Sequence, residues 1–186
     1  MRAALDTNIL VSALIAPTGN PAAIYNVWEQ GKFILLTCTE HLDELRATLQ
    51  KPRVANLIEP YKAGRLVNQI KKLAENVGQL PRVKRSPDPG DNYLLALAEA
   101  GKADYLVTGD KSGLLVLARH KSARIITARD FANSLEQAAD DCRRGKFGDL
   151  VHSEGSPYEH HRSKPELSGK SGFDVLWSLV PQAANP

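Results

Sequence analysis

The chain has 186 residues, of which 42% are hydrophobic and 24% charged, which is typical of a globular domain with an appendage and excludes a fibre or a wholly disordered protein. The formal net charge of +3 is too small to indicate a nucleic-acid partner by itself. Two distant cysteines favour a reduced compartment, and the sequence shows neither a signal-peptide pattern nor a membrane-spanning apolar run, so we expect a cytoplasmic protein outside the membrane.

The first predicted element is a short buried strand at residues 3–5, which stops at the polar triplet Asp6, Thr7 and Asn8. In open α/β sheets, ligands gather beyond the carboxyl ends of the strands, so we expect Asp6 to lie in a crevice there. An unpaired buried carboxylate is unfavourable by several kcal/mol, so Asp6 must be paired, hydrogen-bonded or bound to a cation. The alternative role is a turn or helix cap at the strand end.

Strand and helix patterns then alternate as far as residue 83. Glu44 borders the apolar stripe of the helix predicted over 39–50. Glu40 shares that helical face, but its spacing from Thr37 fits a capping box, so we favour Glu44 for chemistry. The other expected elements are a helix over 22–31, a strand over 33–38, a helix over 61–76 and an edge strand over 77–83.

A loop rich in basic residues and turn formers is predicted over 82–92, leading into a helix. Apolar residues follow Asp91 at i+3, i+4 and i+7, so Asp91 begins the inward face of that helix. Capping of the same helix is the alternative role of Asp91. Asp88, between two prolines, is interpreted as a turn residue.

The strand predicted over 104–107 ends in polar residues, as the first strand does. Asp110 follows it, with a cap of the next short helix as the alternative role, and Thr108 either holds a carboxylate or a water or only ends the strand. A strand over 123–127 and a helix over 130–138, capped by Asp130, complete the alternation. This order predicts an α/β protein with a mostly parallel sheet covered on both faces.

Four carboxylates are placed to meet in one crevice. Several acids in one cleft repel each other, and at neutral pH protons or cations must neutralise them. Hard oxygen donors suit Mg²⁺ or Mn²⁺, and two such ions can stabilise the attacking water and the leaving oxygen in phosphodiester cleavage. The sequence therefore predicts a metal-dependent nuclease with Asp6, Glu44, Asp91 and Asp110 as its catalytic and metal-binding residues.

Four short motifs follow one another along the chain: Leu-Asp-Thr-Asn at 5–8, Glu-Leu-Arg-Ala-Thr-Leu at 44–49, Asp-Pro-Gly-Asp-Asn at 88–92 with Leu-Ala-Leu-Ala at 95–98, and Ala-Asp-Tyr-Leu-Val-Thr-Gly-Asp-Lys at 103–111. In this order the chain resembles PIN-domain proteins, in particular the VapC-type toxin components of toxin–antitoxin pairs, over residues 1 to about 137. One departure is Ser112, which stands where the pattern usually has another acid.

The resemblance implies a three-layer α/β/α sandwich with a mostly parallel central sheet. It also implies an acidic site for Mg²⁺ or Mn²⁺ with Asn8 and Thr108 in support, cleavage of single-stranded RNA, and a small antitoxin partner. We expect a homodimer or higher oligomer. The basic residues Arg82, Lys84, Arg85 and Lys111 are candidates to hold the RNA backbone, the alternative being a solvated turn.

Domain boundaries are expected at residues 1–137 for the nuclease domain and 138–186 for a polar C-terminal tail. A short apolar helix near 173–180 either docks on the protein or stays frayed within that tail. Two other functions are considered: a catalytically idle RNA-binding or scaffold protein of the same fold, and a Rossmann-like small-molecule enzyme. The second is disfavoured because no Gly-x-Gly-x-x-Gly loop follows the first strand.

Overall fold

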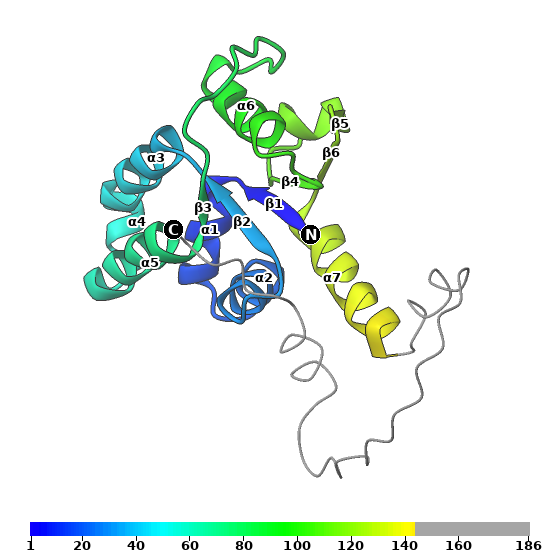
Figure 1. Ribbon diagram of the computed structural model, residues 1–186. Helices are drawn as coiled ribbons and strands as arrows, with labels where there is room; N and C mark the ends of the chain where they lie inside the picture. The colour runs from blue at the N-terminus through cyan, green and yellow to red at the C-terminus, as the bar shows by residue number, and fades with distance from the viewer. Residues whose placement is uncertain (144–186) are drawn as a thin grey trace, which may run out of the picture. The chain divides into compact units, whose positions relative to one another are not determined.

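A six-stranded sheet lies at the centre of the fold and is mostly parallel (Figure 1). The computed structural model describes residues 1–143, of which Met1–Asn133 form one compact unit. The strand order is β3-β2-β1-β4-β6-β5, and only β5 runs antiparallel to its neighbour. The strands are β1 (Arg2–Leu5), β2 (Ile34–Thr37), β3 (Glu75–Asn76), β4 (Tyr105–Val107), β5 (Arg119–His120) and β6 (Ala123–Ile126).

Helices join the parallel strands, because a parallel crossover needs a connection long enough to return to the start of the sheet. Figure 1 shows α6 on one side of the sheet and α1 and α2 on the other. The helices are α1 (Thr7–Ile15), α2 (Asn20–Glu29), α3 (Thr39–Gln50), α4 (Pro52–Ala55), α5 (Pro60–Leu73), α6 (Asn92–Ala100) and α7 (Ala128–Arg143), with short 3₁₀ helices η1 (Pro89–Asp91) and η2 (Leu114–Leu117).

The core on the α6 side follows from the strand register. Ala4 pairs with Leu36 on one side and with Leu106 on the other, so side chains from adjacent strands form one apolar row. These residues are fully buried and pack with Leu94, Leu95, Leu97 and Ala98 of α6. Burial of such aliphatic side chains stabilises the fold by roughly 1.5–3 kcal/mol each.

Aromatic rings pack on the opposite face. Phe131, in the first turn of α7, contacts the ring of Phe33 at 5.3 Å between centroids and that of Tyr105 at the same separation. Tyr105 pairs in register with Ala3, one position out of phase with the row under α6. Both faces are therefore covered, which confirms the predicted three-layer α/β/α fold class.

Several details differ from the sequence-based predictions. The edge strand is Glu75–Asn76, not residues 77–83, because β2 ends at Thr37, which pairs with Asn76 and leaves no strand residue for positions 78–83 to pair with. The first turn of α3 is capped by Cys38, whose Sγ accepts from the His41 amide at 3.4 Å, so the predicted Thr37–Glu40 capping box is absent.

The last helix begins earlier than predicted, at Ala128. Its start is held by Thr127, whose Oγ1 accepts from the Asp130 amide at 3.2 Å and donates to Oδ2 of Asp130 at 2.7 Å. The helix continues to Arg143. None of the described helices combines the length and the apolar character needed to cross a membrane. The predicted apolar helix near 173–180 lies outside the described residues.

Candidate functional site

The site lies at the point in the sheet where the order of the strands reverses, between β1 and β4. From β1 the chain moves outward to β2 and β3, and it then returns to place β4 on the other side of β1. The carboxyl ends of β1 and β4 are joined by a hydrogen bond from the Asp6 amide to the Val107 carbonyl at 2.9 Å. Because the two connections diverge here, a crevice forms beyond these strand ends, where open α/β sheets usually bind ligands.

Asp6 follows β1 and is only 6% exposed. Its Oδ1 accepts from the Asn8 amide at 2.9 Å, and its Oδ2 accepts from the Thr108 hydroxyl at 2.6 Å. The first bond caps α1, so Asp6 fills the alternative capping role and also faces the crevice. Thr108 holds a carboxylate, which was one of its two expected roles, and its Oγ1 also accepts from the Asp110 amide at 3.1 Å.

Asp110 ends the turn after β4 and is fixed by hydrogen bonds. Its Oδ1 accepts from the Ser112 amide at 3.1 Å and from the Ser112 hydroxyl at 3.0 Å, and Oδ2 accepts from the Leu114 amide at 3.4 Å. The bonds from Ser112, before any other cause, lower the pKa of Asp110 below its ordinary value. Ser112, where the resemblance led us to expect an acid, therefore stabilises a neighbouring carboxylate as an anion.

Gly113 shows how closely two of the acids approach. A Cβ atom placed on Gly113 would lie 2.0 Å from Oδ2 of Asp110 and 3.5 Å from Oδ2 of Asp91. The first distance is shorter than any tolerated contact, so a side chain here would displace the Asp110 carboxylate. Gly113 thus leaves room for the carboxylates of Asp91 and Asp110 to lie side by side, although they are far apart in the sequence.

Asp91 precedes the first residue of α6, yet its side chain makes no capping hydrogen bond. Burial, followed by repulsion from Asp6, Asp88, Asp110 and Glu44, raises the pKa of Asp91 to about 6 from an ordinary value of 3.8. Because the Asp91 side chain makes no capping hydrogen bond, its alternative role as a helix cap is not realised. Asp91 is the acid of the cluster whose negative charge is least compensated by the described residues.

These residues surround an open pocket of about 690 Å³. Asp88 also faces it, while its Oδ1 accepts from the Gly90 amide at 2.8 Å in the turn predicted for it. Three of the four proposed acids line this pocket and Glu44 does not. The lining residues are Asp6, Asn8, Pro87, Asp88, Pro89, Asp91, Asp110, Ser112 and Gly113.

Glu44 is connected to the site through Tyr93. The Tyr93 hydroxyl donates to Oε2 of Glu44, so a side chain of α6 holds a side chain of α3 at the margin of the crevice. Burial first, and then the Glu44 carboxylate, raise the pKa of Tyr93 above its ordinary value. Glu44 is itself exposed, and it acts on the pKa of Asp91 more weakly than the other acids do.

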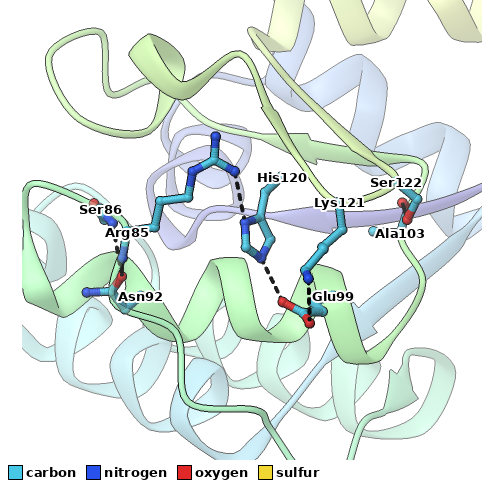
Figure 2. A network of polar contacts seen from close by, with 8 residues as sticks. All are labelled: Arg85, Ser86, Asn92, Glu99, Ala103, His120, Lys121 and Ser122. Carbon is cyan, nitrogen blue, oxygen red and sulfur yellow. Dashed lines mark hydrogen bonds and ion pairs between the residues drawn. The ribbon is translucent and has the colours of Figure 1, made fainter.

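The four basic candidates are all exposed. Arg82 and Lys84 lie in the loop before the pocket wall, and Lys111 follows Asp110. Arg85 differs from them, because its Nη1 donates to Nδ1 of His120 at 3.3 Å (Figure 2). The roles of His120, Tyr93, Ser112 and Gly113 were not predicted from the sequence. Only Ser112 carried a signal in the sequence, as a departure from a motif. The partners of Tyr93 and His120 are distant along the chain, and the need for a glycine at 113 follows from the position of the Asp110 side chain, which the sequence does not show.

The donor chemistry of the pocket fits a hard divalent cation. Mg²⁺ and Mn²⁺ prefer carboxylate oxygens, and such a cation would relieve the repulsion that, after burial, raises the pKa of Asp91. Within residues 1–143, no group of three or more His, Cys, Asp or Glu side chains is already arranged to hold one ion. Asp6, Asp110 and Glu44 are held by hydrogen bonds from Thr108, Ser112 and Tyr93, so the rotation needed to complete a ligand set falls to Asp91.

Comparison with known proteins gives one family. A family model described as "PIN domain" matches residues 2–112, which include Asp6, Glu44, Asp91 and Asp110. Neither the curated proteins nor the solved structures gave a match to this chain.

Proposed function

The chain belongs to the PIN-domain family, whose members are generally nucleases that use divalent metals, and from this premise we propose that it is an endoribonuclease dependent on Mg²⁺ or Mn²⁺. Its substrate is single-stranded RNA, in which it hydrolyses phosphodiester bonds. We propose further that it is the toxin of a toxin–antitoxin pair, restrained by a small antitoxin protein, and that it acts in the cytoplasm as a homodimer or higher oligomer.

One observation carries the proposal: Asp6, Asp91 and Asp110 meet in one pocket at the switch point of the sheet, where burial, together with repulsion from the neighbouring acids, raises the pKa of Asp91 to about 6. A fold does not gain stability from such a cluster, because like charges repel each other across a partly buried space. Clusters of this kind are typical of sites that bind cations or move protons.

The residues have distinct roles in the proposed reaction. Thr108 and the Asn8 amide orient both oxygens of Asp6, and Ser112 orients Asp110. Asp91 is free to turn towards a bound cation, and Tyr93 keeps Glu44 at the edge of the same space. When bound here, divalent ions supply an activated water and stabilise charge on the leaving oxygen. Arg82, Lys84 and Lys111 are exposed and available to phosphates of the strand.

The test is cleavage of labelled single-stranded RNA by the full chain, with parallel reactions in Mg²⁺, Mn²⁺ and EDTA and with duplex RNA and single-stranded DNA as competing substrates. We expect cleavage of single-stranded RNA alone, dependent on the metal. Asp91→Asn should lower the rate at least about 100-fold, because it removes a ligand charge. Asp43→Asn, on the exposed side of α3, is the control and should cleave at the parent rate.

Two outcomes would contradict the proposal. Cleavage that is unchanged in EDTA or in Asp91→Asn would place the chemistry elsewhere. RNA binding without any cleavage would support the alternative of a catalytically idle RNA-binding protein.

The toxin role is tested separately. Induced expression of the parent chain should arrest growth of the host cell, expression of Asp91→Asn should not, and co-expression of the antitoxin should restore growth. A chain that cleaves RNA in solution but leaves growth unchanged would be a nuclease without a toxin role.

A further inference from the structure

The loop that forms one wall of the pocket has few ties of its own. The Val77 amide donates to the Thr37 carbonyl at 2.8 Å. In the segment that follows, from residue 78 to residue 90, no backbone–backbone hydrogen bond to another helix or strand of the described chain is found. Leu80 and Val83 pack against the α6 core, but the segment from Arg85 to Pro89 is held by side chains. Its position therefore depends on a small number of polar contacts.

One tie is local. Oδ1 of Asn92 accepts from the amides of Arg85 and Ser86, at 2.8 and 3.0 Å, and its Nδ2 donates to the Pro89 carbonyl at 3.2 Å. Asn92 is the first residue of α6, so it fixes the loop against its own helix. This tie does not connect the loop to the sheet.

The long-range tie is His120 of β5. It is 4% exposed, and its Nε2 lies 3.0 Å from Oε2 of Glu99 while its Nδ1 lies 3.3 Å from Nη1 of Arg85 (Figure 2). Lys121 stands on the other side of the same carboxylate, with Nζ 3.6 Å from Oε1 of Glu99. His120 thus joins the loop, α6 and β5 at one point.

The direction of each hydrogen bond is fixed by chemistry. An arginine guanidinium is always a donor, so Nδ1 of His120 must accept from Arg85. The ring is then neutral with its proton on Nε2, where it is donated to the Glu99 carboxylate. Glu99 therefore selects the tautomer that presents a lone pair to Arg85.

From this geometry we infer that His120 is a positioning residue of the nuclease site. Oriented by Glu99, it holds the Arg85 guanidinium and so fixes the wall formed by Pro87, Asp88 and Pro89. His120 acts through Arg85 and does not itself line the pocket. The part of this inference that concerns RNA rests on the proposed function, whereas the ordering of the loop does not.

Two variants of His120 separate the roles of its nitrogens. In His120→Asn the amide oxygen lies near the place of Nδ1 and keeps an acceptor for Arg85. In His120→Gln the amide nitrogen reaches the place of Nε2 and keeps the bond to Glu99, but the acceptor at Nδ1 is lost. Lys121→Ala, next along the chain, is the control because it leaves both His120 contacts in place.

The first measurement is the rate of trypsin cleavage of the Arg82–Val83 bond in the folded full chain. Loss of one hydrogen bond that holds the loop should raise this rate about fivefold in His120→Gln and in Arg85→Ala. His120→Asn and Lys121→Ala should be cleaved at the parent rate. The double variant Arg85→Ala/His120→Gln should be cleaved no faster than either single variant, because both remove the same contact.

The inference is overturned if His120→Asn is cleaved as fast as His120→Gln, or if the effects of the two single variants multiply in the double variant. Either result would make His120 a space-filling residue independent of Arg85.

The second measurement is RNA cleavage. His120→Gln should raise KM about fivefold and leave kcat within about twofold of the parent, since the acids are untouched. His120→Asn should restore the parent KM. An equal fall of kcat, or no restoration by Asn, would overturn the positioning role. If the parent cleaves no RNA, the proposed function fails while the trypsin result stands by itself.

Discussion

Asp91 is the residue at which the repulsion among the acids is measurable. Its pKa of about 6, raised by burial and by the neighbouring acids, means that the folded protein keeps a proton that the unfolded chain releases at lower pH. The contribution of Asp91 to the free energy of unfolding of the metal-free protein should therefore fall as pH rises from about 4 to about 6, and this loss is complete above that window. An asparagine at this position carries no ionisable group, so the variant should lack this part of the pH dependence.

We accordingly expect Asp91→Asn to raise the Tm of the metal-free protein above pH 6, by on the order of 3 °C. At pH 4 the two proteins should unfold alike, because the parent carboxyl is already protonated. Thermal unfolding followed by circular dichroism in EDTA measures both. Asp43→Asn is the control, and a gain that is equal at both pH values would refute the electrostatic cause.

Asp6 offers no equally clean substitution. Both of its oxygens accept hydrogen bonds, so an amide would either place a donor against the Asn8 amide or make the Thr108 hydroxyl accept where it now donates. Loss of activity in Asp6→Asn would combine a missing charge with a rearranged strand end. Asp91, which has neither bond, isolates the charge.

At the scale of elements, α3 and α6 are joined by the bond from Tyr93 to Glu44. Tyr93→Phe removes only the hydroxyl, so Glu44 loses its fixed orientation and the ring stays packed against His41, 6.2 Å away between centroids. We expect the affinity for Mn²⁺ to fall about fivefold to tenfold with little change in Tm.

Titration calorimetry with Mn²⁺ measures this change without any RNA. Tyr61→Phe, which removes a hydroxyl from an exposed tyrosine of α5, is the control and should bind Mn²⁺ as the parent does. An unchanged affinity in Tyr93→Phe would show that Glu44 takes no part in holding the ion.

The strands show which features of the fold could be predicted from sequence patterns. The strands at 2–5, 34–37, 105–107 and 123–126 were predicted because apolar runs bounded by turn residues identify buried parallel strands. The two-residue strands β3 and β5 were not, since elements so short carry no periodicity. The polar ends of β1 and β4 indicated where Asp6 and Asp110 would lie. The contacts of Tyr93 and His120 depend on tertiary packing and could not be inferred from spacing.

At the scale of the whole molecule, the net charge of +3 is small, so the proposed binding of RNA would have to depend on local charge. Replacement of Arg82, Lys84 and Lys111 by Ala should weaken binding to every RNA sequence and reduce the slope of log K against log salt by about 2. Fluorescence anisotropy in EDTA measures binding without cleavage.

The matched control is replacement of Arg53, Lys71 and Lys72, three exposed basic residues that do not line the pocket. It changes the net charge equally and should leave the slope near that of the parent. Equal slopes for the two triple variants would show that overall charge, and not the surface beside the acids, attracts the RNA.

The order of the strands in the sheet also determines at which stage of protein synthesis the site can form. The Thr108 hydroxyl that orients Asp6 is 102 residues away along the chain, and Ser112, which orients Asp110, comes later still. During translation, Asp6 emerges first and must wait for β4 before its carboxylate is fixed, because non-local contacts form only after the intervening chain is made. A nascent chain shorter than residue 112 therefore has its first acid but no assembled site. Synthesis from the N-terminus keeps a nuclease of this architecture inactive until most of its sheet has left the ribosome.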